Sequence, residues 1–358
     1  MYKVLNIGDI TNPKTQLRET SGSRTALLKD GKYIAVINTK TTSSSNDFIP
    51  TVSYSDDGLT WSEPKLLFPE YVDKKSVYVS VRNTDDGRIS ICGWCADIAY
   101  PGEEWWNDEL SAMKENQLCY TISSDGYDIP PLKFLDLPFY GAAEIPGGMH
   151  VDKNGVMTIV YSPYTTIEAR EKADTNCLVR MISNDDGKTW KSDKIAVVSG
   201  ESLYAETWIT ELASGAKFVS TWQTASSSAP DQWLYAKDGI NFGNVNPYPF
   251  KGQSTALLAL KDGRVLVAYN QRKEHPVGVW VAVIRPDENG LNLIENAPVW
   301  TTSTGNTSGN SDNNFSGWTT FSFGEPQITE MKDGTFLMAI WYAENGINGV
   351  RYVRFSIE

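Results

Sequence analysis

The sequence predicts an all-β fold, a six-bladed β-propeller of four-stranded antiparallel blades. The prediction starts from Arg24–Val36, RTALLKDGKYIAV, in which two apolar runs flank an Asp-Gly pair. Glycine adopts a positive φ at little cost, so this pattern is typical of a hairpin with a tight two-residue turn. The same pattern occurs six times, at the turn glycines Gly31, Gly87, Gly155, Gly215, Gly263 and Gly334.

The spacing of these glycines sets the size of the repeat. They lie 48 to 71 residues apart by subtraction of their residue numbers, which leaves room for two further strands after each hairpin. Each repeat is therefore expected to form one blade, and residues 1–358 to form a single propeller domain. Apolar strands also stand at both ends, at Tyr2–Ile7 and Gly349–Ile357. We expect the first of these to complete the last blade, because closing the ring removes exposed sheet edges.

Composition and charge exclude several classes of protein. The net charge of -12 and the pI of about 4.8 argue against a nucleic-acid partner, which would require a basic surface. The sequence contains no apolar run of roughly 18 residues, so no membrane-spanning helix is expected. The first residues, MYKVLNIGD, lack the basic and then apolar pattern of a signal peptide. The expected location is the cytoplasm, or outside the cell if a leader has been removed.

The cysteines indicate buried thiols rather than a metal or redox site. Cys92 and Cys95 form a CGWC motif inside the second hairpin, and residues three apart on a strand point to opposite faces. Cys119 and Cys177 have no metal-ligand spacing either. His150 lies within the strand phrase GGMHVD and is expected to be a packed residue. The sequence therefore predicts no metal and no cofactor.

Two octets resemble the Asp-box, S-x-D-x-G-x-T-W. They are Tyr54–Trp61, YSDDGLTW, and Ser183–Trp190, SNDDGKTW, of which the first has Tyr where Ser is expected. With these octets and its six hairpins, the chain resembles the sialidase (neuraminidase) superfamily of BNR/Asp-box propellers. In that family the box is a structural turn on the face away from the active site. The resemblance therefore implies that Asp56 and Asp185 lie outside the site.

The blade pattern also predicts where a ligand would bind. If the Asp-Gly turns and the Asp-boxes share one face, the starts of the inner strands and the loops after the second strands share the other. Burying many charged groups there without a purpose would be costly, so this face is expected to hold a ligand site. The inner-strand starts carry Arg24, Lys74, Lys75, Glu144, Glu206, Gln253 and Glu325. The loops carry Lys40, Asp47, Asp97, Tyr161, Tyr164, Trp222, Gln223, Arg272, His275 and Tyr342.

The resemblance implies roles for individual residues. Arg24, in SRTALL, takes the position of the first of three arginines that bind the substrate carboxylate in sialidases. Arg272, in YNQRKEHPVGV, resembles the third arginine, whereas Trp222 takes the position of the second. Glu206, in AETWITEL, resembles the glutamate that assists the nucleophile. Asp47, in SNDFIP, lies near the position of the acid/base aspartate.

The largest departure from that family is Glu325, in FGEPQITEM, where sialidases have a nucleophilic tyrosine. Tyrosine suits sialic acid because this sugar bears a carboxylate on its anomeric carbon, which would repel an anionic nucleophile. An aldose has no such carboxylate, so a glutamate can serve. Losing the tyrosine and one arginine together implies a substrate other than sialic acid. The sequence leaves open that Glu325 is only a solvated residue of the central channel.

We therefore predict a glycoside hydrolase that removes a terminal sugar, with a carbohydrate partner and neither nucleic acid nor membrane. Exo-arabinanases resemble this architecture and also use glutamates. Two alternatives stay open, namely an exo-sialidase in which another tyrosine attacks, and a non-catalytic carbohydrate-binding propeller.

The predicted catalytic residues are Glu206, Glu325 and Asp47. The predicted substrate-binding residues are Arg24, Arg272, Glu144, Trp222, Gln253, Tyr342 and Asp97. Trp105 and Trp106 are expected either to stack on the sugar or to pack on a neighbouring blade.

Overall fold

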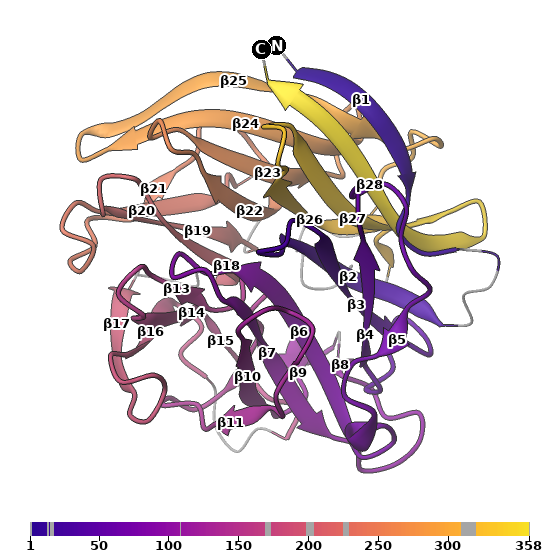
Figure 1. The fold of residues 1–358 in the computed structure, drawn as a ribbon. Helices are drawn as coiled ribbons and strands as arrows, with labels where there is room; N and C mark the ends of the chain where they lie inside the picture. The colour runs from indigo at the N-terminus through magenta and orange to yellow at the C-terminus, as the bar shows by residue number, and fades with distance from the viewer. Residues whose placement is uncertain are drawn as a thin grey trace.

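The computed structural model describes residues 2–12, 14, 18–107, 109–168, 173–197, 204–224, 229–308 and 320–357. Six four-stranded antiparallel sheets stand around a central axis, as Figure 1 shows. This arrangement confirms the predicted six-bladed propeller. The structure contains the 3-10 turn η1 (Pro69–Tyr71), and no helix in the described part of the chain has the length and apolarity to cross a membrane.

The blades follow one another along the chain. Blade 1 contains β2 (Glu19–Leu27), β3 (Tyr33–Lys40), β4 (Ile49–Ser55) and β5 (Lys65–Leu66). Blade 2 contains β6 (Lys75–Asn83), β7 (Ile89–Asp97), β10 (Gln117–Ser123) and β11 (Lys133–Leu135). Blade 3 contains β13 (His150–Val151), β14 (Met157–Tyr161), β16 (Cys177–Ser183) and β17 (Lys191–Val197). Blade 4 contains β18 (Tyr204–Glu211), β19 (Lys217–Gln223), β20 (Gln232–Ala236) and β21 (Asn246–Pro247). Blade 5 contains β22 (Gln253–Ala259), β23 (Val265–Gln271), β24 (Gly278–Asp287) and β25 (Gly290–Thr301).

Blade 6 joins the two ends of the chain. It contains β26 (Phe323–Glu330), β27 (Phe336–Glu344), β28 (Ile347–Ile357) and β1 (Tyr2–Asp9). Strand β1 pairs antiparallel with β28, so that Tyr2 lies opposite Ile357, and the two termini lie side by side in Figure 1. The N-terminal strand thus closes the ring, as predicted, because its backbone groups pair with the last strand of the chain.

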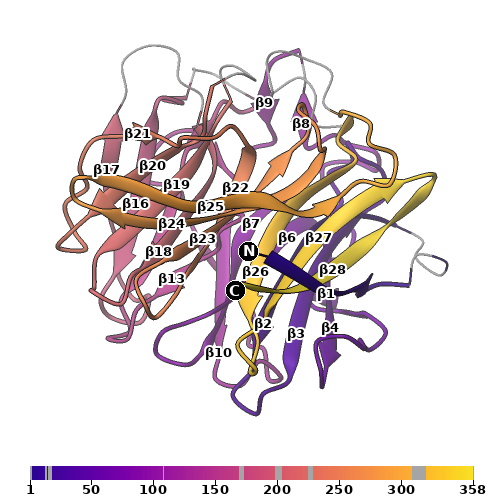
Figure 2. The same cartoon turned by 90° about the horizontal axis from the view of Figure 1, so that it is seen from above.

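Two short pairs of strands lie outside the blades. Strands β8 (Trp106–Asn107) and β9 (Ala112–Met113) form a hairpin that rises above the ring in Figure 2. Strands β12 (Ala142–Ala143) and β15 (Pro163–Tyr164) pair next to blade 3. Both pairs belong to the long connections of blades 2 and 3, which reach the face where the inner strands begin.

All six predicted hairpins form, but their turns are one residue longer than predicted. In the first, the Leu28 N–H donates to Lys32 O at 2.8 Å and the Gly31 N–H donates to Leu28 O at 2.8 Å. Three residues therefore lie between the paired ends, a loop that ends with glycine at positive φ. The other five turn glycines make the same backbone contact and have φ between 77° and 85°. The Asp-Gly pattern predicted the hairpin, because such turns also need a residue at positive φ.

Both octets form the local hydrogen bonds expected of capped turns. In the first octet, however, the aspartate that accepts them is not the predicted one. In the second octet, Asp185 accepts from the Thr189 N–H at 2.9 Å, as expected. In the first, Asp57 rather than Asp56 accepts from the Thr60 N–H at 2.7 Å, and Ser55 supplies the serine that position 54 lacks. Asp56 is exposed and pairs with Lys32. The turn is therefore one residue shorter than in the second octet.

The core lies between neighbouring blades. Cys92 packs in a cluster with Met157 and Ile159 of blade 3, whereas Cys95 packs in a cluster with Val36 of blade 1. The two thiols of the CGWC motif thus point to opposite faces of β7, as predicted. All four cysteines are buried and unbridged.

Four inner strands carry a β-bulge near the same end. The bulged residues with positive φ are Gly22 in β2 (89°), Glu206 in β18 (48°), Ser254 in β22 (60°) and Glu325 in β26 (50°). Positive φ is costly for residues other than glycine and is found where the surrounding structure holds it. A bulge re-aims a side chain relative to the regular alternation of a strand. These bulges therefore mark the end of the channel at which side chains gather.

Candidate active site

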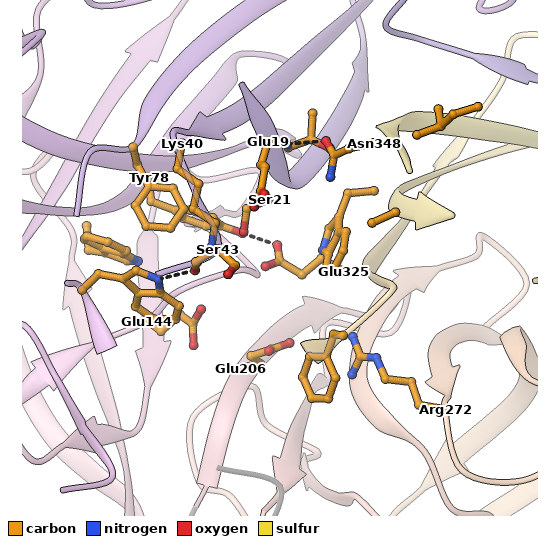
Figure 3. A pocket seen from close by; sticks show the side chains of 18 of the residues that line it. Glu19, Ser21, Lys40, Ser43, Tyr78, Glu144, Glu206, Arg272, Glu325 and Asn348 are labelled. Atoms are coloured by element: carbon orange, nitrogen blue, oxygen red, sulfur yellow. Dashed lines mark hydrogen bonds between the residues drawn. The ribbon is translucent and has the colours of Figure 1, made fainter. Parts of the chain in front are cut away.

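A cavity of about 370 Å³ opens at that end of the central axis. In Figure 3 the side chains of Glu144, Glu206 and Glu325 extend from three sides toward its centre. They come from blades 3, 4 and 6, which the ring closure brings together. The other residues that line the cavity are Glu19, Thr20, Ser21, Lys40, Ser43, Phe48, Tyr78, Trp94, Trp105, Arg272, Phe321, Trp341, Ala343, Gly346, Ile347 and Asn348.

Glu325 forms a buried ion pair at the wall of this cavity. Arg24 donates from Nη2 to Oε2 of Glu325 at 2.9 Å and from Nη1 to its backbone oxygen at 3.0 Å. The Tyr78 hydroxyl donates to the same carboxylate oxygen. Arg24 is 1% exposed, so solvent screens this pair weakly. The second carboxylate oxygen of Glu325 carries no protein hydrogen bond among the described residues and belongs to a side chain that lines the cavity.

Gly22 makes room for this cluster. A Cβ atom built on Gly22 would lie 2.5 Å from Oε2 of Glu325 and still closer to the Tyr78 hydroxyl. Blade 1 therefore has glycine at the bulge where blades 4 and 6 have glutamate. The absence of a side chain in one blade is what allows the Tyr78–Glu325 contact from two others.

We expect Gly22→Ala to damage activity more than stability. The variant adds backbone strain of about 1–3 kcal/mol and displaces the Tyr78–Glu325 pair. Gly102→Ala is the matched control, because Gly102 has a similar φ of 82° but nothing within 4 Å of a built Cβ. Thermal unfolding and turnover of both variants separate strain from displacement. A similar small loss of turnover in the two variants would contradict this role of Gly22.

Glu206 is positioned by the bulge of β18, in which it lies, and by a contact from the bulge of β22 in blade 5. Ser254, at the bulge of blade 5, donates its hydroxyl to Oε2 of Glu206. Both residues are buried, and Glu206 is 8% exposed. Burial raises the pKa of Glu206 well above its usual range, and repulsion from Glu144 and Glu325 adds to this effect. The positive charge of Arg272 partly offsets it.

Glu144 approaches the same centre from blade 3. The Tyr164 hydroxyl donates to Oε2 of Glu144 at 3.2 Å. Burial and the charge of Glu325 raise the pKa of Glu144 to about 8, although the Tyr164 contact, Lys40 and Arg24 act in the opposite direction. Both shifts favour the protonated form of these two glutamates. The cavity combines two carboxylic acids with one carboxylate in an ion pair.

The basic groups of the cavity are held by the protein itself. Arg272 donates from Nη2 and Nε to the Phe323 backbone oxygen, at 2.8 and 3.0 Å, and its guanidinium lies 3.7 Å from the centre of the Phe321 ring. Lys40 donates to the Ser43 backbone oxygen at 2.7 Å. Burial lowers the pKa of Lys40 to about 8, against the opposing effect of nearby carboxylates. Both side chains are thus positioned by hydrogen bonds to backbone oxygens.

Aromatic side chains form one side of the cavity. Trp105 stacks near Trp94 at 6.5 Å between ring centres, and Phe48 meets both rings edge-on. Trp105 lines the cavity, whereas Trp106 is buried in the core beside it. The packing alternative therefore applies to Trp106, whereas stacking of Trp105 on a sugar stays a prediction. Flat aromatic surfaces of this kind suit the apolar face of a sugar ring.

The structure brings together some of the predicted site residues and separates others. Glu206, Glu325, Glu144 and Arg272 line the cavity, and Arg24 contacts it through Glu325. Gln253 lies behind Arg272, with Oε1 at 3.5 Å from Nη1, and Trp222 lies behind Phe321 in a buried cluster.

Three predicted residues lie elsewhere. Asp47 pairs with Arg18 at 3.2 Å and accepts from the Thr41 N–H at 2.9 Å, outside the residues that line the cavity. Asp97 pairs with Lys75 at the wall of a different cavity. The Tyr342 hydroxyl donates to Asp9 at 3.2 Å, away from the cavity.

Sequence reasoning missed several residues of the cavity, above all Tyr78 and Glu19. Tyr78 lies in the middle of β6, within a run of buried residues that resembles an ordinary core strand. Glu19 starts β2 five residues before Arg24, which the sequence took as the start of the strand. Only Gly22 gave a hint, since a glycine inside a strand often marks a bulge or a close approach.

Comparison with known proteins identifies the fold. The sequence matches no protein-family model and no curated protein. Among solved structures, a protein of unknown function from Dyadobacter fermentans has a TM-score of 0.73 at 16% identity, over 100% of this chain and 99% of that one. An α-L-arabinanase from Penicillium chrysogenum, solved with arabinobiose, has a TM-score of 0.64 at 12% identity, over 98% of both chains. A leech intramolecular trans-sialidase has a TM-score of 0.63 at 11% identity, over 99% of this chain and 70% of that one. The chain therefore has the sialidase-like six-bladed propeller fold that sialidases and arabinanases share.

Proposed function

We propose that this protein is a glycoside hydrolase that removes a neutral sugar from the end of a glycan. The observation that carries the proposal is the set of three glutamates that line one cavity, two of them with raised pKa values and the third in an ion pair. Glycoside hydrolysis usually needs one carboxylic acid and one carboxylate on opposite sides of the scissile bond. This cavity supplies both.

We assign Glu325 as the carboxylate that attacks the anomeric carbon. Its charge is balanced by Arg24, and it raises the pKa of both other glutamates. We assign Glu144 as the proton donor, because its pKa of about 8 is close to the working range of a general acid. Glu206, whose pKa is raised by burial and by the charges of Glu144 and Glu325, hydrogen-bonds a sugar hydroxyl.

The charge balance favours a neutral sugar. A substrate carboxylate would need arginine donors, but Arg24 donates to Pro146, Ser23 and Glu325, and Arg272 donates to Phe323. The carboxylate of Glu325 would also repel an anion. The similar arabinanase, whose structure holds the neutral sugar arabinobiose, supports the same substrate class.

A panel of nitrophenyl glycosides tests the proposal. We expect release of nitrophenol from a neutral glycoside, such as an arabinofuranoside or a hexopyranoside, and little release from a glucuronide or a sialoside. Turnover should be lost in Glu325→Gln protein prepared in parallel, which controls for contaminating hydrolases. Glycan binding without turnover by the wild-type protein on the whole panel would show a binding propeller instead.

A second candidate is a sialidase-like reaction with Tyr78 as nucleophile. One contact favours it, the hydrogen bond from Tyr78 to Glu325, because sialidases pair a tyrosine with a glutamate. Burial and the nearby charge of Glu325 raise the pKa of Tyr78 well above its usual range, which opposes this role. Preferred turnover of the sialoside, lost in Tyr78→Phe, would establish it.

The role of Arg24 separates these proposals further. We expect Arg24→Lys to lower kcat for neutral substrates, because lysine keeps a charge but loses the paired contacts with Glu325. KM for acidic and neutral sugars should change by similar factors. A rise in KM confined to acidic sugars would instead show that Arg24 binds a substrate carboxylate. Circular dichroism of the variant establishes that the ring is intact.

A further inference from the structure

The inner strands of the propeller reach a second cavity, of about 530 Å³, at their other ends. Strand β18 has Glu206 in the first cavity and Glu211 in the second, and β26 likewise has Glu325 in the first and Glu330 in the second. Next to this second cavity lie Asp85, His150 and Glu211, which the proposed glycosidase reaction does not use.

We propose that Asp85, His150 and Glu211 bind a divalent transition-metal ion of the Zn²⁺ type. One nitrogen or oxygen atom from each residue lies within 4.8 Å of the other two. The residues come from three neighbouring blades: Asp85 from the turn after β6, His150 from β13 and Glu211 from the end of β18. Their wide separation in the sequence explains why ligand spacing gave no sign of them.

The buried imidazole is the strongest observation. His150 is 2% exposed, and its Nε2 atom has no hydrogen-bond partner. It lies 3.7 Å from Oδ2 of Asp85 and 3.7 Å from Oε2 of Glu211, too far for hydrogen bonds. Two ligand atoms of a tetrahedral Zn²⁺ site lie about 3.4 Å apart, given metal–ligand distances of about 2.1 Å. Both 3.7 Å separations are close to this value, so a metal could lie between the three residues.

The surroundings hold the three residues in place. The Asp85 N–H donates to the Val151 backbone oxygen at 2.9 Å, which fixes the turn of blade 2 against the strand that carries His150. Asp85 and Glu211 line the second cavity, so a fourth ligand such as water can reach the metal.

Two cations also face this cluster, and they define the competing interpretation. The charges of Arg82 and Lys217 act on His150, and without a metal they would balance the two carboxylates. In the part of the chain that the structure describes, however, the carboxylates of Asp85 and Glu211 lie within ion-pair distance of His150 alone. Arg82 instead donates to the Gly147 backbone oxygen at 3.3 Å. The carboxylates thus remain available to a metal.

Zinc binding by the full chain tests the inference independently of glycosidase activity. Protein stripped with a chelator and dialysed is titrated with Zn²⁺ by calorimetry, and with Co²⁺ while its visible absorption is recorded. We expect one Zn²⁺ per chain, a higher Tm with Zn²⁺, and the strong visible bands of tetrahedral Co²⁺. Mg²⁺ and Ca²⁺, which prefer more oxygen ligands, should not reproduce this behaviour.

Three variants make the result specific. Asp85→Asn and Glu211→Gln should each weaken Zn²⁺ binding by more than about tenfold and remove the rise in Tm, since even outer contacts of metal ligands change affinity by about that factor. Glu330→Gln, a carboxylate of the same cavity outside the cluster, should bind as the wild type does. Changing buried His150 could prevent folding, whereas Asp85 is exposed, so Asp85→Asn should fold and still report on metal binding. Absence of stoichiometric binding by the wild type, or equal weakening in Glu330→Gln, would overturn the inference.

Discussion

Glu325→Gln is expected to lower kcat by about 10³- to 10⁶-fold, the range seen when an enzyme loses its nucleophile. The amide cannot attack the anomeric carbon, although it can still accept hydrogen bonds from Arg24 and Tyr78. Initial rates on the neutral glycoside found in the panel measure the effect. Glu330→Gln is the matched control, because it makes the same change on the same strand but outside the active-site cavity.

Stability must be separated from chemistry in this variant. Removing one partner of a buried ion pair leaves Arg24 uncompensated and typically costs about 3–5 kcal/mol. Thermal unfolding therefore accompanies the kinetics, and Glu325→Ala is assayed with and without azide. A small anionic nucleophile can occupy the vacated space, so azide should restore turnover and yield a glycosyl azide. Full activity of Glu325→Gln, or no effect of azide on folded Glu325→Ala protein, would remove Glu325 from the role of nucleophile.

The second large effect is expected for Glu144→Gln, and it should depend on the leaving group. Loss of a general acid costs about 10²- to 10⁴-fold when the leaving group needs a proton. The loss should be much smaller for a dinitrophenyl glycoside, whose leaving group departs without one. Glu206→Gln should slow both substrates to a similar extent. The opposite pattern, with leaving-group dependence in Glu206→Gln, would assign the acid to Glu206.

The pH dependence offers a separate test of the same assignment. Glu144 has a pKa raised to about 8, so it is protonated and active below that pH and loses its proton above it. Wild-type kcat is therefore expected to fall as the pH rises through about 8. Lys40 has a pKa lowered to about 8 and titrates in the same range. The alkaline fall should disappear in Glu144→Gln and persist in Lys40→Met, whereas the reverse result would assign it to Lys40.

The blades of this protein could be predicted from the sequence because their signals are local. Each hairpin is specified by a turn glycine between two apolar runs, which follows Asp in four hairpins, Asn154 in one and Ser214 in another. The glycine is required because the turn needs positive φ at that residue. The pairing of β1 with β28 followed from a general requirement, since an open ring would expose sheet edges. Glu206 and Glu325 could be located because each starts an inner strand, at a known distance from its turn glycine.

Other features were decided only by the tertiary structure. Loops between strands have no periodic pattern, so the position of Asp47, between β3 and β4, was predicted near the site although Asp47 pairs with Arg18 outside the cavity. The contact of Tyr78 with Glu325 joins blades 2 and 6, and it depends on the absence of a side chain at Gly22 in blade 1. No local pattern encodes such a contact, because it arises from strands that the chain brings together only when the ring closes. The same reason applies to protonation: the pKa of Glu144 depends on burial and on the charge of Glu325, which is 181 residues away by subtraction of residue numbers and a neighbour only in the folded propeller.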